Sequence, residues 1–147
     1  MIFVISHGQS VIADGQLPRK ADLVLQFAYH ITWSKGASEL VFCAVGSAKF
    51  ADALEKKVTG KVIQGRKSVV QQGQGGNCNI IVGISTSVRG GNGVLTVSDV
   101  SNFAQNGGMI ELVSDNNKVF FEINNQAARS RGVKISSQLL KLAKKVY

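Results

Sequence analysis

The segment GVLTVSDVSNFAQNGGMIELVSDNNKVFFEINNQAA, residues 93–128, carries the pattern that decides the fold. Val94–Val97 is typical of a buried strand, and a short helical piece is expected around Phe103. Two further strands are expected at Met109–Ser114 and Lys118–Ile123. Asp115–Asn117 supplies the turn between them, because Asn and Asp tolerate positive φ and bond their own backbone. This part of the chain therefore predicts a sheet that ends in an antiparallel hairpin.

Strands and helices alternate through the rest of the chain. Apolar runs predict strands at Glu39–Val45 and Cys78–Ile84, and one or two short strands near Val62–Ile63 and Lys67–Gln71. Helical spacing of apolar residues predicts four helices: Arg19–Trp33 with Pro18 at its start, Ala48–Val58, Asn124–Arg131, and a last helix capped by Ser136 or Ser137. The apolar stripe expected on the last helix consists of Ile135, Leu139, Leu142, Ala143 and Val146.

This alternation predicts the fold class. Strands that alternate with helices form layered α/β domains with a largely parallel sheet. We therefore expect a single three-layer domain with a mainly parallel sheet, an antiparallel C-terminal hairpin at its edge and helices on both faces. A chain of 147 residues is long enough for one such core.

Composition and charge narrow the class of protein. Hydrophobic residues make up 44% of the chain, yet no run approaches the ~18 apolar residues that a membrane helix needs. The formal net charge is +8, and no acid follows Glu122 although six Lys and Arg residues do. This basic end is either a solvated helix face or a contact for an anionic partner.

Residues 1–13, MIFVISHGQSVIA, differ from the remainder because they contain no Asp, Glu, Lys or Arg. Val11-Ile12-Ala13 resembles a signal-peptidase site, although the usual basic start and longer apolar run are missing. We expect a signal-peptide remnant over residues 1–13 and a mature α/β domain over residues 14–147. The alternative is a short buried strand at MIFVIS.

Residue patterns that carry chemistry are sparse. There is no CxxC pair, and two His with two Cys do not make a zinc set. The glycines of Gly73–Gly76 lack the Lys-Ser or Lys-Thr of a phosphate loop, and His30 lies in a predicted helix without Ser and Asp partners. We therefore expect no enzyme, no metal or cofactor, and no nucleic-acid partner. Cys43 and Cys78 lie at the edges of two strand-like runs, so they are either a disulfide in an oxidising compartment or two buried thiols.

Two groups of residues are candidate binding surfaces. Polar residues and a double glycine at strand ends are candidates for a ligand or partner cleft: Ser98, Asp99, Gly107, Gly108, Glu122 and Asn124. Asp99 and Glu122 are also the best candidates for a carboxylate pair, although capping of backbone amides is the commoner role. The first predicted helix has more apolar residues than one stripe needs, which suggests a partner or dimer surface: Leu23, Leu25, Tyr29 and Trp33.

An ordered set of short motifs resembles the YfiR-like family. The motifs are L-T-V-S-D, F-A, G-G-M-I-E-L-V, K-V-x-F-E-I-N, A-A-R and I-S-S-Q-L-L-K-L-A, and the similarity runs from about Lys20 to Leu142. Members are periplasmic proteins that hold a membrane-bound diguanylate cyclase inactive, and an outer-membrane lipoprotein sequesters them. Some members carry a second cysteine pair late in the chain, which is missing here, so redox control through that pair is not expected.

The resemblance implies a non-enzymatic periplasmic repressor that binds the periplasmic sensor region of an inner-membrane diguanylate cyclase and lowers cyclic-di-GMP signalling. It also implies a Cys43–Cys78 disulfide and a homodimer. A periplasmic small-ligand-binding sensor domain is the alternative function, and a cytoplasmic doubly wound enzyme is a third, disfavoured by the missing phosphate-binding glycines.

Overall fold

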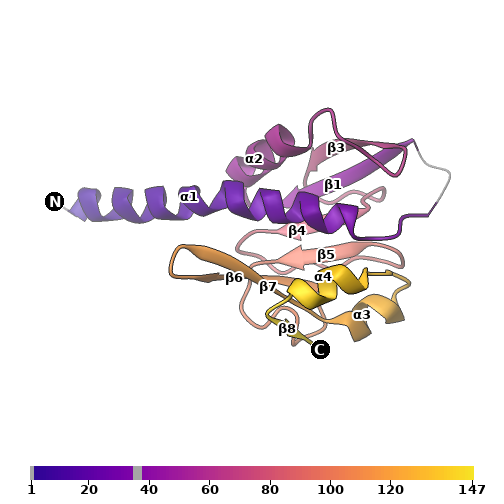
Figure 1. Cartoon of the computed structure of the whole chain (residues 1–147). Coiled ribbons are helices and arrows are strands. Elements are labelled where there is room, and N and C mark those ends of the chain that lie inside the picture. The colour runs from indigo at the N-terminus through magenta and orange to yellow at the C-terminus, as the bar shows by residue number, and fades with distance from the viewer. Residues whose placement is uncertain (1, 35–37) are drawn as a thin grey trace.

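The fold is taken from a computed structural model that describes residues 2–34 and 38–147, with side chains from residue 16 onward. Its centre is one eight-stranded sheet with the order β2-β3-β1-β4-β5-β6-β7-β8 (Figure 1). The strands are β1 (Glu39–Val45), β2 (Val62–Ile63), β3 (Arg66–Gln72), β4 (Ile80–Gly83), β5 (Leu95–Ser98), β6 (Ile110–Asp115), β7 (Lys118–Ile123) and β8 (Lys145–Val146). The pairs β2–β3 and β6–β7 are antiparallel, and the other five are parallel. The expected α/β class, with a mainly parallel sheet and an antiparallel hairpin, is confirmed, but β8 and not the hairpin forms that edge of the sheet, because the C-terminal residues pair with β7.

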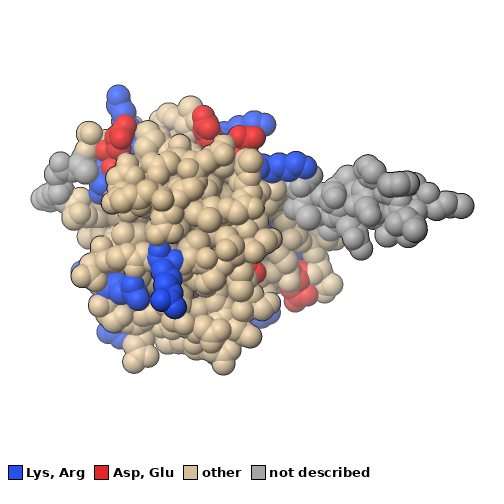
Figure 2. Space-filling view, turned by 180° about the vertical axis from the view of Figure 1, so that it is seen from behind, with Lys and Arg blue, Asp and Glu red and all other residues tan. Residues whose placement is uncertain are grey.

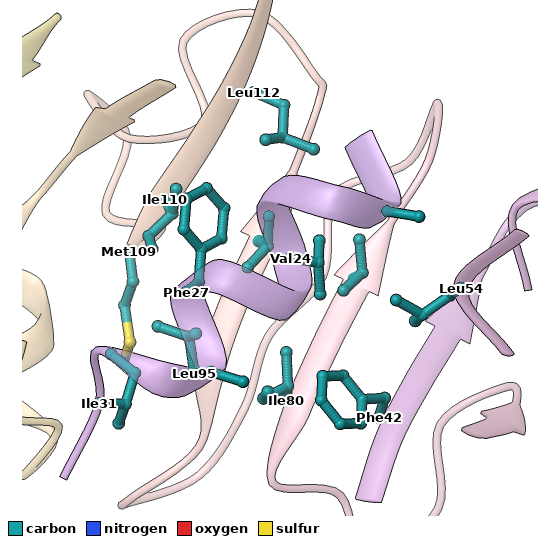
Figure 3. Packing of buried hydrophobic residues seen from close by; sticks show 14 of the residues in the cluster. Val24, Phe27, Ile31, Phe42, Leu54, Ile80, Leu95, Met109, Ile110 and Leu112 are labelled. Atoms are coloured by element: carbon teal, nitrogen blue, oxygen red, sulfur yellow. The ribbon is translucent and has the colours of Figure 1, made fainter. Parts of the chain in front are cut away.

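The four helices of the described residues pack on one face of this sheet. They are α1 (Ile2–Tyr29), α2 (Ala48–Val58), α3 (Asn125–Ser130) and α4 (Ser137–Leu142). Their buried side chains join those of alternate residues of β1, β4, β5, β6 and β7 in a single apolar cluster. Val24 and Phe27 of α1 lie over Ile80, Leu95 and Ile110 of the central strands (Figure 3). The Phe27 ring also meets the Phe121 ring edge to face at 5.0 Å between centroids.

The opposite face of the sheet, which we call the loop face, is covered by chain connections. A second, smaller cluster joins Val41, Cys43 and Ile81 of the strands to Cys78, Val88 and Phe103 of the loops. The loops over residues 73–79, 84–94 and 99–109 link β3, β4, β5 and β6. Helices were expected on this face too, but each link is shorter than the dozen or more residues that a helical crossover needs. Loops therefore form the third layer.

The boundaries of the first helix differ from the prediction. Helix α1 contains Pro18 in its interior, although Pro18 was expected at its start. Pro18 is exposed, and it has no amide hydrogen to donate within the helix. The helix also ends at Tyr29 and not at Trp33, because Ile31 pairs with Ile135 and the Thr32 amide donates to the Lys134 carbonyl.

Two other local predictions were wrong. Ser101–Gly107 is a series of turns and not a helical piece, since Asn102 and Gly107 have φ of 67° and 102° and interrupt a right-handed helix. The last helix ends at Leu142, which is 65% exposed, so its stripe does not continue to Val146. The chain turns back there and adds β8 to β7.

Candidate functional site

The two cysteines form a disulfide on the loop face. Cys43 of β1 and Cys78, which precedes β4, have sulfur atoms 2.02 Å apart and Cα atoms 5.8 Å apart. The Asn79 amide donates to the Val41 carbonyl, and the Val41 amide donates to Asn79 Oδ1, so these hydrogen bonds also hold the two segments side by side. The expected pairing is confirmed, and the alternative of two buried thiols is excluded.

Ser98 and Asp99 hold neighbouring segments together at the end of β5. The fully buried Ser98 hydroxyl donates to the Thr86 carbonyl at 2.7 Å and accepts from the Val100 amide at 3.1 Å. Asp99 accepts from the Ser85 amide at 2.6 Å and forms an ion pair with the buried Lys20 ammonium of α1 at 2.9 Å. Both polar side chains are thus committed to anchoring the loop after β4 and the helix α1.

Glu122 and Asn124 are also committed to local contacts, beside β8 and α3. Glu122 accepts from the Tyr147 hydroxyl at 3.1 Å. Asn124 caps α3 by accepting from the Ala127 amide, and its Nδ2 donates to the Ala104 carbonyl at 2.8 Å. Asp99 and Glu122 each have partners of their own, so they show no contact that would make them a carboxylate pair.

The register places a different acid opposite Glu122. Glu111 of β6 is its cross-strand partner, is only 8% exposed, and accepts from the Asn102 and Ala104 amides. Sequence reasoning overlooked Glu111, and the signal was an acid inside the apolar run G-M-I-E-L-V. Its carboxylate fixes the turns after β5.

Gly107 and Gly108 line a hollow of about 510 Å³ on the loop face. Its walls come from residues 87–90 on one side and from residues 100–108 on the other, with Thr96 of β5 between them. A Cβ on Gly108 would lie 2.2 Å from the Phe103 ring, so only glycine allows these turns to pack. We call this feature the loop-face hollow.

Two arginines also line the loop-face hollow. Arg89 is exposed, and its guanidinium has no hydrogen bond to another described residue. Arg131 follows α3, and its guanidinium donates to the Gly90 carbonyl. Nothing in the spacing of Arg89 and Arg131 shows that the fold brings them to one hollow, and the sequence marks Arg131 only as one of the six basic residues after Glu122.

The candidate surface on the first helix divides into separate parts. Leu25 and the half-exposed Tyr29 are four residues apart and share one flank of α1. Leu23 lies on another flank, beside a groove of about 350 Å³ that α1 forms with residues 118–120 of β7. Trp33 was wrongly assigned to this surface: it is 7% exposed, and its Nε1 donates to the Ala28 carbonyl at 2.9 Å. The turn after Tyr29 directs Trp33 into the core.

The described residues contain neither a candidate metal site nor a candidate membrane helix. His30 Nδ1 lies 3.0 Å from Ser136 Oγ and so links α1 to the start of α4. No group of three or more His, Cys, Asp or Glu side chains in the described part gathers as metal ligands would. No helix there is long and apolar enough to cross a membrane.

Comparison with known protein families gives a match over most of the chain. The model of the YfiR/HmsC-like family matches residues 18–144, which include most of the described fold. A search of curated proteins found no match to this chain. Members of the matching family are periplasmic regulators of diguanylate cyclase signalling.

Proposed function

This chain belongs to the YfiR/HmsC-like family, and from that premise we propose that it binds and represses the periplasmic sensor region of an inner-membrane diguanylate cyclase. The observation that carries the proposal is the family match over residues 18–144, from the second half of α1 to the chain after α4. In this role the protein lowers cyclic-di-GMP signalling without touching the nucleotide, which is made in the cytoplasm. It is a regulator and not an enzyme.

The disulfide supports a periplasmic location for this protein. Disulfides persist in oxidising compartments, among them the bacterial periplasm, and are rare in the cytosol. Cys43 and Cys78 are both buried and joined, as a periplasmic domain would have them. We further propose that residues 1–13 are the remnant of an export signal and that the mature domain covers residues 14–147. The side chains of residues 1–15 are outside the described part, and the backbone from Ile2 is helical, so the alternative of a strand at MIFVIS does not hold.

The flank of α1 that carries Leu25 and Tyr29 is the surface we propose for the cyclase. Tyr29 is 50% exposed, and Leu25, one helical turn before it, is half-buried and packs against the core. Tyrosines of this kind often dominate binding energy, because the ring buries a large area and the hydroxyl keeps a polar contact. We also propose two other partners: a second copy of this chain, which gives a homodimer, and an outer-membrane lipoprotein. These partners compete for the exposed surface of the same protein.

The experiment measures cyclic-di-GMP in a strain that lacks the gene for this protein. Loss of the protein should raise cyclic-di-GMP, and the wild-type chain should restore the low level. Tyr29→Ala should fail to restore it and should weaken binding to the purified periplasmic region of the cyclase by about tenfold or more. Leu142→Ala is the matched control, because Leu142 is also an exposed apolar helix residue. Unchanged cyclic-di-GMP after deletion would refute the proposed function.

A second candidate function, a periplasmic small-ligand sensor, is favoured by one observation. The loop-face hollow, at about 510 Å³, lies within the ~300–1,000 Å³ range of small-molecule sites. Of the residues expected to line such a site, Gly107 and Gly108 do so, and Ser98, Asp99, Glu122 and Asn124 do not. A sensor and a repressor are compatible in one protein.

A further inference from the structure

The loop-face hollow has polar lining groups without a hydrogen-bond partner in the described part of the chain. Ser87, Ser101 and Asn106 line it, and their side chains make no hydrogen bond to another described residue. Thr96 Oγ1 accepts from the Met109 amide at 3.2 Å, while its hydroxyl hydrogen has no acceptor among the described residues. Several free donors that border one hollow are what a polar ligand requires.

The charge at the hollow has one sign. Arg89 and Arg131 line it, and no lining residue is acidic. Basic side chains gather in the lower left of this face, the side on which α3 lies, and no acidic side chain lies among them (Figure 2). Among the described residues Arg131 makes one side-chain hydrogen bond, to the Gly90 carbonyl, so most of its five N–H donors stay free there. A guanidinium group is planar and can donate two parallel hydrogen bonds to a carboxylate or a phosphate. Arg89 and Arg131 provide two such groups.

The inner part of the hollow is apolar. Val88 and Phe103 are 8% and 6% exposed, and both belong to the cluster that packs around the disulfide. Val100 adds a third apolar wall. A ligand that reaches them buries its own apolar body there while its charge stays near the arginines at the surface.

We propose that the loop-face hollow binds a small organic anion, in which a carboxylate or phosphate meets Arg89 and Arg131 and an apolar body lies against Val88, Val100 and Phe103. This inference deepens the second candidate function and rests on it. It does not require repression of a cyclase. The shape supports the placement, because glycines at positions 90, 107 and 108 leave the backbone on both sides of the hollow without side chains.

The test is isothermal titration calorimetry of the purified full chain with four probes. Phenyl phosphate and phenylacetate carry an anion on an apolar body, inorganic phosphate carries only the anion, and benzyl alcohol carries only the body. We expect one or both aromatic anions to bind at least tenfold more tightly than inorganic phosphate and benzyl alcohol. The preferred aromatic anion tells whether the natural ligand is a phosphate or a carboxylate.

Charge-matched variants identify the site. Arg89→Gln should weaken binding of the preferred aromatic anion at least tenfold, because it removes one of the two guanidinium groups at the hollow. The fold should not change, because the Arg89 guanidinium has no hydrogen bond to another described residue. Arg129→Gln removes the same charge from an exposed side chain of α3 that does not line the hollow, and it should change the affinity less than twofold. Both variants should keep the wild-type circular dichroism and melting temperature.

Three outcomes would overturn the inference: no binding of either aromatic anion at millimolar concentration, equal weakening by the two variants, or equal affinity for inorganic phosphate and the aromatic anions. Absence of binding would mean that the hollow does not take this class of ligand. Equal weakening would mean that the anions respond only to the net charge of the protein. Equal affinities would mean that the apolar walls do not contribute to binding. Because no cyclase is present, these results are independent of the cyclic-di-GMP experiment.

Discussion

Reduction of the Cys43–Cys78 disulfide should destabilise the protein by an amount that the loop length sets. The two residues are 35 positions apart. In the chain-entropy model the cross-link removes about 12.7 cal/mol/K from the unfolded chain, which is about 3.8 kcal/mol at 25 °C. With an unfolding entropy of roughly 2.1 cal/mol/K per residue over the chain of 147 residues, this loss lowers the melting temperature by about 12 °C.

Urea unfolding with and without a phosphine reductant measures this difference. Because the model assigns the effect to the unfolded state, the reduced protein should expose more surface when it unfolds, and its dependence on urea should be steeper. A Cys43→Ala, Cys78→Ala double variant is the control, since the reductant should leave its curve unchanged. A difference in unfolding free energy below about 1 kcal/mol between the oxidised and reduced forms would contradict the reasoning. Detection of two free thiols in the native protein before any reductant is added would contradict it as well.

Three further changes test contacts that position the loops. Asp99→Ala should cost about 3 kcal/mol of unfolding free energy in urea melts, because it leaves the buried Lys20 ammonium without its partner, whereas adding Lys20→Met should recover most of that loss. Gly108→Ala should cost about 1–3 kcal/mol because its Cβ meets an aromatic ring at 2.2 Å, while Gly91→Ala, with nothing within 4 Å of its Cβ, should be neutral or slightly stabilising in thermal melts. Asn124→Ala should cost about 1–2 kcal/mol by removing the cap of α3 and should speed amide exchange at the start of that helix; unchanged exchange would argue against the cap.

The sequence predicted best those elements whose local signals agree with their burial. Three elements have the same bounds in the structure as in the prediction: β1 at Glu39–Val45, α2 at Ala48–Val58 and β7 at Lys118–Ile123. In each case the apolar period and the flanking turn residues indicate the same boundary. Ser47 illustrates this agreement, because it caps α2 by accepting from the Phe50 amide at 3.0 Å.

The errors occur where a distant strand decides the local structure. The chain after Leu142 has a helical pattern, but the Lys144 amide donates to the Phe121 carbonyl and the Tyr147 amide to the Ile123 carbonyl, so this end joins the sheet. Trp33 has an apolar side chain at helical spacing, but pairing of the chain just before it with residues 134–135 ends the helix first. The partners of the C-terminal end lie more than twenty residues away, and those of the chain before Trp33 lie about a hundred residues away, both beyond the reach of local periodicity.

The candidate site was predicted only in part for a related reason. Strand-end polar residues were expected to converge on a ligand, yet Ser98, Asp99 and Asn124 each satisfy backbone or charged groups next to them. A buried polar side chain must have a partner, so a strand end often uses its polar residues internally. The two arginines of the loop-face hollow come from loops 42 positions apart, and only the folded sheet brings them to the same place.

The division of the sheet into a helix-covered face and a loop-covered face has an evolutionary consequence. Substitutions under the four helices disturb one shared core, whereas changes in residues 84–94 and 99–109 affect shorter connections that run over the outside. Relatives can therefore exchange the chemistry of one side while inheriting the scaffold of the other. A family of regulators thereby gains a means to diversify without redesigning its architecture.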